Sequence, residues 1–394
     1  MENVYIVAAK RTPIGGLLGN LSNFSAPQLG EIAIRSVLEE TSIAPTEIDS
    51  VYMGNVLSAN VGQSPARQAS IFAGISVETD CTTVNKVCAA GMKAVITGAQ
   101  QIQLGIDNIV VAGGMESMSN TPHYLMHRKS DKFGNAVLVD GLLKDGLTDV
   151  YNNYHMGNAA ELCAREYNLS REEQDEYALA SYEKATRATQ SGKFKKEIVP
   201  IEIQQKTGVV TITDDEDIYK IIPEKVSKLK PSFEEGGTIT AANASNLNDG
   251  AAALLLVSEK VLKQNNLKPL AKIIGYADAA QAPEWFTTAP SIAIPKALKQ
   301  ANLSLDQIDY FEINEAYSAV ILANQRILGI APEKINVYGG GVAMGHPIGC
   351  SGARIITTLL SVLAQEGGQY GVAAICNGGG GASAIVVENL TNTK

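Results

Sequence analysis

Histidine and cysteine are scarce in this 394-residue chain, which has four of the first and five of the second. Neither residue type forms the close-spaced ligand pattern of a zinc site, so the sequence predicts no zinc centre. The cysteines are odd in number and scattered, and the chain does not open on a charged segment followed by an apolar one. We therefore expect reduced thiols, no secretory signal and a cytoplasmic protein.

Positive charge and long apolar runs are also in short supply. The formal net charge is −9 at pH 7, which argues against a nucleic-acid partner. No apolar run looks long enough to cross a membrane, so no membrane partner is expected. What the chain does contain is 45% hydrophobic residues and 36 glycines, the composition of a soluble globular protein with many tight turns.

The two ends of the chain resemble each other. The dipeptide Ile48-Asp49 recurs roughly 260 residues later, and Gly91 in "CAAGMKAVI" aligns with Gly352 in "GCSGARIIT" at nearly the same offset. Each half alternates segments with the pattern of strands and of helices. We therefore predict a duplicated α/β unit, each copy a mostly parallel sheet with helices on its faces.

The sequence between the halves has a different character. It is more polar, holds most of the clustered lysines, and contains Ser170 followed three residues later by Glu173, a capping box that predicts a helix start. The expected organisation is a first half at residues 1–120 plus 247–267, an inserted loop domain at 121–246, and a second half at 268–394.

The stretch "VNKVCAAGMKAV", residues 84–95, places a cysteine before a run of small and apolar residues. The run predicts a buried helix, with Asn85 as its cap and Cys88 at its opening. The positive end of a helix dipole favours the thiolate form of a cysteine. Cys88 is thus a candidate nucleophile, although a lone buried cysteine is more often a small core residue.

Two glycine-rich stretches stand near the C-terminus. "GGGVAMGHPIGCSG" contains His346, "AAICNGGGGAS" contains Cys376, and Asn314 ends the strand-like "YFEIN". Each signal is weak alone, and the glycines could mark a dinucleotide loop, but no G-x-G-x-x-G follows the first strand. Duplication would bring these residues and Cys88 to one rim, at strand ends. One thiol could then carry an acyl group, while the other acts as a base beside backbone N–H donors.

Six motifs resemble those of the thiolase family, and the resemblance covers essentially the whole chain. They are "VNKVCAAGMKA", "VVAGGMESMS", "AANASNLNDGAAA", "NEAY", "GHPIGCSG" and "CNGGGGAS". The resemblance implies an α/β fold of five layers, αβαβα, with an inserted loop domain. It also implies reversible Claisen condensation of two acetyl-CoA to acetoacetyl-CoA plus CoA through an acetyl-cysteine, with CoA thioesters as substrates and no required cofactor.

Three alternatives remain beside that activity. The nearest is a degradative 3-ketoacyl-CoA thiolase with a broader range of chain lengths. A ketoacyl synthase would need two catalytic histidines, and here only His346 lies in a matching motif. A non-catalytic acyl-CoA-binding relative would not need Cys88, His346 and Cys376, which are all present.

The resemblance assigns roles to five residues. Cys88 would be the acylated nucleophile. His346 would activate Cys88 and form a first oxyanion hole with a water held by Asn314. Cys376 would be the acid/base, and the backbone N–H groups of Cys88 and Gly378 would form a second oxyanion hole.

The resemblance also implies substrate contacts. Ser245 would meet the pantetheine arm of CoA, and His155 with Met156 would line a short acyl pocket. Tyr317 stands where phenylalanine is usual and adds a hydroxyl near that pocket, and Ala90 replaces a common serine of the nucleophile motif. The basic residues of the inserted domain expected to meet the CoA phosphates include Lys225, Lys228 and Arg128.

Two further features follow from the resemblance alone. Some relatives bind potassium, and the matching positions for a possible ion are Tyr219, Ala241, Ala242, Ala244 and Val342. The family also suggests a homotetramer, a dimer of dimers, with residues 121–145 as the tetramer contact.

Overall fold

Strands and helices alternate in the first half of the chain, as the sequence predicts. The computed structural model describes residues 2–125, 133–206 and 208–391. The first-half strands are β1 (Val4–Arg11), β2 (Gly15–Gly16), β3 (Ser50–Gly54), β4 (Asp80–Val84), β5 (Ile109–Ser117) and β12 (Asn248–Ser258). The helices of this half are α1 (Ala26–Glu39), α2 (Pro65–Phe72), α3 (Ala90–Gln103) and α7 (Glu259–Gln264).

The second half repeats this alternation. Its strands are β13 (Ala271–Ala280), β14 (Tyr310–Ile313), β15 (Tyr370–Asn377) and β16 (Gly381–Asn389). Its helices are α8 (Pro290–Ala301), α9 (Ser318–Leu328), α10 (Gly341–Met344) and α11 (Ile348–Glu366).

In the part of the chain that the structure describes, ten strands join into one sheet. The first half supplies the order β4-β3-β5-β12-β1, with β2 beside β12, and the second half supplies β13-β16-β15-β14. The halves meet where β1 pairs antiparallel with β13, from Val4 opposite Ile273 to Ile6 opposite Ala271.

Three apolar cores divide the protein into five layers. The first core lies between the first-half strands and helices α1 and α2. Another lies between the second-half strands and helices α8 and α9. The core between these two joins α3 and α11 to the inner faces of β1, β12, β15 and β16. The helices α3 and α11 therefore form a shared central layer, and the five-layered αβαβα arrangement is confirmed.

The two glycines that align the halves lie where the central helices cross. A Cβ atom on Gly91 of α3 would stand 2.9 Å from the Gly349 carbonyl oxygen, and one on Gly352 of α11 would stand 2.3 Å from the Met92 nitrogen. Any side chain at either position would push the helices apart. The repeated glycine thus marks the closest contact between the copies.

The repeated aspartate has the same role in both halves. Asp49 accepts the N–H groups of Asn108 and Ile109, where β5 begins. Asp309 accepts those of Gln369 and Tyr370, where β15 begins. Each carboxylate fixes the strand that lies beside it, β3 with β5 and β14 with β15.

The prediction of mostly parallel sheets is wrong in part. β3 is parallel to β4 and β5, and β14 is parallel to β15. The other pairs are antiparallel, β5 with β12, β12 with β1, and β15 with β16. The physical reason in the second half is a tight turn: Gly379 and Gly380 have φ of 85° and 84°, which lets β15 return directly as β16.

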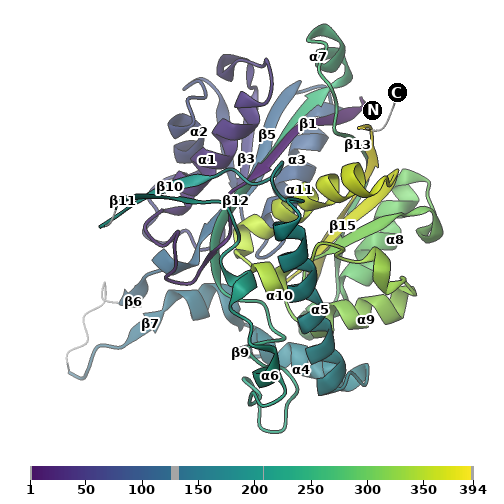
Figure 1. The fold of residues 1–394 in the computed structure, drawn as a ribbon. Coiled ribbons are helices and arrows are strands. Elements are labelled where there is room, and N and C mark those ends of the chain that lie inside the picture. The colour runs from purple at the N-terminus through teal and green to yellow at the C-terminus, as the bar shows by residue number, and fades with distance from the viewer. Residues whose placement is uncertain (1, 126–132, 207, 392–394) are drawn as a thin grey trace.

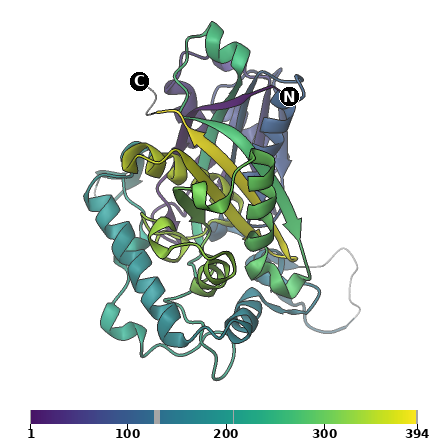
Figure 2. The ribbon, with the colours of Figure 1, turned by 90° about the vertical axis from the view of Figure 1, so that its right-hand side faces the viewer.

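The inserted segment covers one end of the halves. Its helices are α4 (Met156–Glu166), α5 (Arg171–Gln190) and α6 (Pro223–Val226). Its strand pairs are β6 (His123–Leu125) with β7 (Leu138–Asp140), β8 (Thr148–Asp149) with β9 (Tyr154–His155), and β10 (Ile201–Gln205) with β11 (Gly208–Ile212). Helix α5 has the predicted capping box at Ser170 and Glu173. Helices α4 to α6, in teal, lie at the lower side in Figures 1 and 2.

One helix of the described residues is long and apolar enough to cross a membrane, which the sequence interpretation overlooked. Helix α11 has 19 residues and a mean hydropathy of 1.3. It is also the central core helix, with 83% of that window buried inside the protein.

Candidate active site

A cavity of about 730 Å³ opens between the two halves and the inserted segment. The predicted residues that line it are Cys88, His155, Met156, Lys225, Ala241, Ala242, Ala244, Ser245, Tyr317, His346 and Gly378. Those that do not line it are Asn314, Cys376, Lys228, Tyr219 and Val342. Arg128 lies outside the described residues.

Cys88 lies in a tight turn before α3 and not inside the helix. The N-cap residue is Ala89, which has no side-chain cap bond. Asn85 Oδ1 accepts the N–H of Val87 at 3.0 Å, so the prediction that Asn85 caps the helix is wrong. Val87 has φ of 48°, a left-handed conformation that costs energy for a β-branched residue. The turn aims the thiol at the cavity.

The expectation of a resting thiolate is wrong. Burial raises the pKa of the Cys88 thiol to about 11. The backbone N–H groups of Gly378 and of Cys88 itself oppose this shift, but they do not outweigh the loss of water. Cys88 is therefore a thiol at rest and needs a base at the moment of attack.

His346 is the base available on the cavity wall. Its ring Nε2 lies 3.4 Å from Asn314 Nδ2, and its Nδ1 lies 2.6 Å from Ser351 Oγ. Its backbone N–H donates to Asn248 Oδ1 at 2.9 Å. Burial first, and then the Arg354 charge, lower the pKa of His346 to about 3. The imidazole is neutral at rest and can accept a proton.

Asn314 follows the end of β14 and holds a free acceptor. Its backbone N–H donates to the Ala374 carbonyl oxygen of β15 at 2.9 Å. Its side-chain oxygen is buried and has no hydrogen-bond partner among the described residues. A buried acceptor of this kind is normally satisfied by water, which supports a water-mediated oxyanion hole beside His346.

Cys376 lies on β15 behind the cavity wall and is fully buried. Burial and the neighbouring Cys88 raise the pKa of its thiol. The next turn begins with Gly378, whose N–H points to the Cys88 sulfur. The two cysteines thus share one small volume with the backbone donors, as a proton-transferring thiol beside a nucleophile requires.

The cavity wall near Cys88 carries apolar and aromatic side chains. A Cβ atom on Gly378 would stand 3.6 Å from Met156 Cε, so Met156 lies against the backbone donors. The ring of Phe233 stacks on His155 at 4.7 Å and meets Tyr317 edge-on at 6.1 Å. Burial raises the pKa of the Tyr317 phenol, which keeps it protonated.

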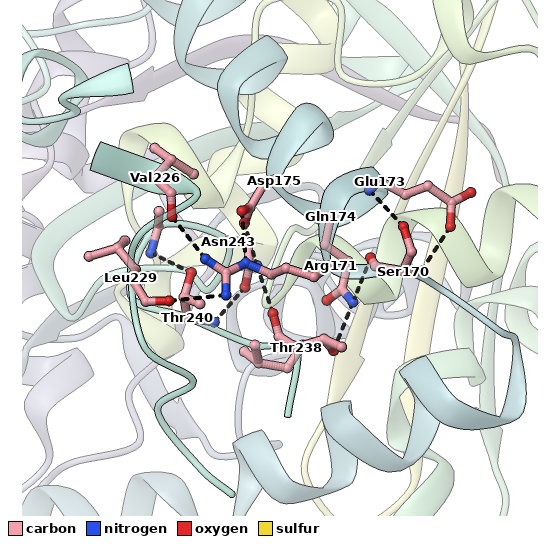
Figure 3. A network of polar contacts seen from close by, with 12 residues as sticks. Ser170, Arg171, Glu173, Gln174, Asp175, Val226, Leu229, Thr238, Thr240 and Asn243 are labelled. Atoms are coloured by element: carbon pink, nitrogen blue, oxygen red, sulfur yellow. Dashed lines mark hydrogen bonds and ion pairs between the residues drawn. The ribbon is translucent and has the colours of Figure 1, made fainter. Parts of the chain in front are cut away.

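The segment that carries Ser245 is held on α5 by a polar network (Figure 3). Arg171 donates to the carbonyl oxygens of Val226 and Leu229, at 2.8 and 3.1 Å, and pairs with Asp175. Asp175 accepts the side-chain N–H of Asn243 at 2.9 Å. The network fixes both ends of the segment that lines the cavity.

Among the described residues, two lysines of the inserted segment line the cavity. Lys220 lines it but pairs with Glu216 and Asp217. Lys225 also lines it, and the described residues offer it no ion pair. Its charge is therefore the more available of the two for an anionic ligand.

The possible potassium position is not assembled as expected. Tyr219 is exposed, and its hydroxyl donates to Asp214 at 3.1 Å. Ala241, Ala242 and Ala244 line the cavity instead with Tyr182, which the sequence interpretation missed. Burial raises the pKa of Tyr182 to about 12. The residues expected to hold the ion therefore do not fit as one set.

Glu116 is a second missed residue. It is fully buried and accepts the N–H groups of Val56, Leu57 and Gly349 and the side-chain amide of Asn55. Burial raises its pKa to about 7 although these donors favour the carboxylate. The contacts tie β5 to the start of α11, directly after His346. The signal was present in "GGMES", where a charged residue ends a buried strand.

A half-buried thiol beside a neutral imidazole, a second thiol and converging N–H groups defines a site for acyl transfer through cysteine. Sequence models of the thiolase N-terminal domain and the thiolase C-terminal domain match residues 4–260 and 267–389. The chain belongs to the thiolase family.

Similar curated proteins cover nearly the whole chain. Acetyl-CoA acetyltransferase 2 of Arabidopsis thaliana is 57% identical over 99% of this chain and 98% of its own length. A cytosolic acetyl-CoA acetyltransferase of Gibberella zeae is 56% identical over 98% of each. The acetyl-CoA acetyltransferase of Saccharomyces cerevisiae is 53% identical over 99% of this chain and 100% of its own.

Solved structures share the fold. The Acat5 thiolase of Ascaris suum in complex with coenzyme A has a TM-score of 0.94 at 46% identity, covering 99% of this chain and 100% of that one. Human mitochondrial 3-ketoacyl-CoA thiolase has a TM-score of 0.96 at 38% identity, covering 98% of this chain and 99% of that one. The Bacillus anthracis acetyl-CoA acetyltransferase has a TM-score of 0.96 at 40% identity, covering 99% of each chain.

Proposed function

We propose that this protein is an acetyl-CoA C-acetyltransferase, which reversibly condenses two acetyl-CoA to acetoacetyl-CoA plus CoA. The observation that carries the proposal is the meeting of Cys88, His346 and Gly378 on one cavity, with Met156 beside them. Relatives more than 50% identical and named for this activity support it. The chemistry uses CoA thioesters and requires no cofactor.

In the first half of the proposed reaction, the Cys88 sulfur attacks the thioester carbonyl while His346 Nε2 takes the thiol proton. The N–H groups of Cys88 and Gly378 hold the oxyanion that forms. The bond to the CoA sulfur then breaks, and Cys376 gives its proton to the leaving thiolate. Acetyl-Cys88, a protonated His346 and a deprotonated Cys376 remain.

In the second half, Cys376 takes a proton from the methyl group of a second acetyl-CoA. Water on Asn314 and the protonated His346 Nε2 stabilise the enolate oxygen. The enolate carbon attacks acetyl-Cys88, the bond to the Cys88 sulfur breaks, and His346 returns its proton to that sulfur. Both halves together restore all three side chains.

The acyl pocket gives the test that separates this function from a degradative thiolase. Because Met156 forms part of the pocket wall, thiolysis is expected to fall from acetoacetyl-CoA to 3-ketohexanoyl-CoA, since a pocket discriminates by roughly 1–3 kcal/mol per methylene. The measurement is the rate of thiolysis across a series of chain lengths. Met156→Ala should raise the relative rate with the longer substrate. Equal rates of cleavage of 3-ketopalmitoyl-CoA and acetoacetyl-CoA would favour a degradative thiolase. A complete lack of activity would favour a non-catalytic relative.

Lys225 is proposed to meet the CoA phosphates, and Lys228 offers a matched control three residues away. Lys225→Met is expected to raise KM for acetyl-CoA about fivefold, the effect of losing roughly 1 kcal/mol of exposed charge attraction. Lys228→Met should leave KM unchanged, because Lys228 does not line the cavity. Dephospho-CoA substrates show whether the 3′-phosphate is the partner. An equal rise in KM in both variants would mean that general surface charge, and not a contact with Lys225, attracts the substrate.

Two further proposals rest on the relatives. A cytosolic relative at 56% identity supports a cytoplasmic location. A homotetramer, built as a dimer of dimers through residues 121–145, is proposed from the family. Exposed apolar side chains in that segment, among them Leu125 and Phe133, support a contact there.

A further inference from the structure

We propose that Ser351 is the positioning residue that makes His346 a base. Its hydroxyl lies 2.6 Å from His346 Nδ1, on the first turn of α11, and both residues are buried. The inference deepens the proposed function and rests on it, since it names the group that prepares His346 to accept the proton of Cys88.

The second contact of Ser351 decides the direction of this hydrogen bond. Ser351 Oγ lies 3.0 Å from the carbonyl oxygen of Pro347, which can only accept. A hydroxyl has one proton, and here it is donated to Pro347. The lone pairs of Ser351 Oγ are then left for the N–H of His346 Nδ1.

The opposite side of the ring agrees with this assignment. Asn314 Nδ2, a donor, faces His346 Nε2 at 3.4 Å. Nε2 must therefore carry a lone pair, and the proton of the neutral ring must be on Nδ1. The nitrogen that faces the cavity is thus unprotonated, as a base for Cys88 requires.

A hydroxyl suits this position better than a carboxylate would. A carboxylate beside Nδ1 would stabilise the imidazolium and hold the proton on the histidine. Ser351 is neutral, so it fixes the ring and its tautomer without charge. His346 can then return its proton to the Cys88 sulfur at the end of the second half of the reaction.

The test removes the Ser351 hydroxyl and compares it with a matched hydroxyl on the same helix. Thr357 is buried on α11, and its hydroxyl donates to the Ala353 carbonyl oxygen one turn back, as that of Ser351 does to Pro347. It makes no contact with His346. Ser351→Ala is expected to lower kcat about 10- to 100-fold with KM changed less than twofold. This loss is smaller than the roughly 10²- to 10⁴-fold contribution of general acid–base catalysis, because His346 itself remains. Thr357→Val should change neither.

Two further readouts separate positioning from structure. Ser351→Thr keeps the hydroxyl and is expected to recover most of the lost kcat. Alkylation of Cys88 by iodoacetamide, measured from pH 6 to 9, also needs the base and should be slower in Ser351→Ala than in the wild type. If Ser351→Ala does not fold, Ser351→Cys fills the position with a weaker acceptor and has the same expected outcomes.

The outcomes distinguish this inference from the proposed function. If the wild type is active and the kcat and alkylation rate of Ser351→Ala both lie within threefold of the wild-type values, the role of Ser351 is overturned while the proposed function stands. Equal losses of kcat in Ser351→Ala and Thr357→Val would mean that the Ser351 hydroxyl only stabilises helix α11. A wild type without thiolase activity would overturn the proposed function, while slower alkylation in Ser351→Ala would still support the pairing with His346.

Discussion

Cys88→Ser is expected to abolish both halves of the reaction. Burial already raises the pKa of the thiol to about 11, and a serine hydroxyl in the same turn ionises far less readily. His346 would then have to remove a proton that is held far more tightly than that of the thiol. Condensation and thiolysis should both fall by roughly 10⁴-fold or more, the loss typical of a removed nucleophile.

Mass spectrometry after incubation with acetyl-CoA checks the assignment. The wild type should carry an acetyl group on the peptide with Cys88, and the variant should carry none. Cys81→Ser is the control, because Cys81 is half-buried like Cys88 but lies on the edge strand β4. Cys81→Ser should keep wild-type activity. An acetyl group found on Cys81 or Cys163 in the wild type would remove Cys88 from its role.

The duplicated architecture could be predicted because its signals are local and repeated. Ile48-Asp49 and its copy at residues 308–309 lie at the same place in each half, and each aspartate fixes the neighbouring strand. Gly91 and Gly352 meet at the crossing of the central helices. Sequence periodicity alone did not predict the antiparallel pairs, because strand direction depends on turns such as Gly379-Gly380 and on where the chain re-enters after the insertion.

Residue types were more predictable than their chemical states. The sequence led to Cys88, but it also predicted a thiolate at that position and Asn85 as the cap of the helix, and neither detail holds. Helix position favours the anion, whereas desolvation opposes it, and the strength of desolvation depends on the depth of the residue in the folded protein. Asn85 does not cap the helix because its side-chain oxygen accepts the N–H of Val87, in the turn before the helix.

Residues that act through others left little trace in the sequence. Tyr219 aligned with the potassium position but is exposed, while Tyr182 lines the cavity from α5. Ser351 lies in the motif "GHPIGCSG", but its proposed role follows from its distance to His346. Tyr182 comes to the same cavity as Ala241 only in the tertiary structure, so one sequence gives no pattern that predicts their contact with it. Ser351 is only five residues from His346, but the turn before α11 that brings the two side chains together is not visible in the sequence.

Cys376→Ser is expected to separate the two halves of the reaction. The substitution preserves size but raises the pKa of the acid/base far above neutrality, so the methyl proton of the second acetyl-CoA cannot be removed. Condensation should fall by about 10³-fold, within the range of a lost general base. Cys88 retains His346 and its two backbone N–H donors, so it should still be acylated, with the leaving CoA protonated more slowly by water.

The measurement is mass spectrometry of the variant after acetyl-CoA, together with the rate of acetoacetyl-CoA formation. An acetyl group that accumulates on Cys88 while condensation is lost would support the division of labour. Cys163→Ser is the matched control, since Cys163 is as buried as Cys376 but lies on α4, away from the cavity wall. It should lose stability without this uncoupling. If the wild type carries its stable acetyl group on Cys376, the two cysteines have exchanged roles, because only the nucleophile forms a covalent intermediate.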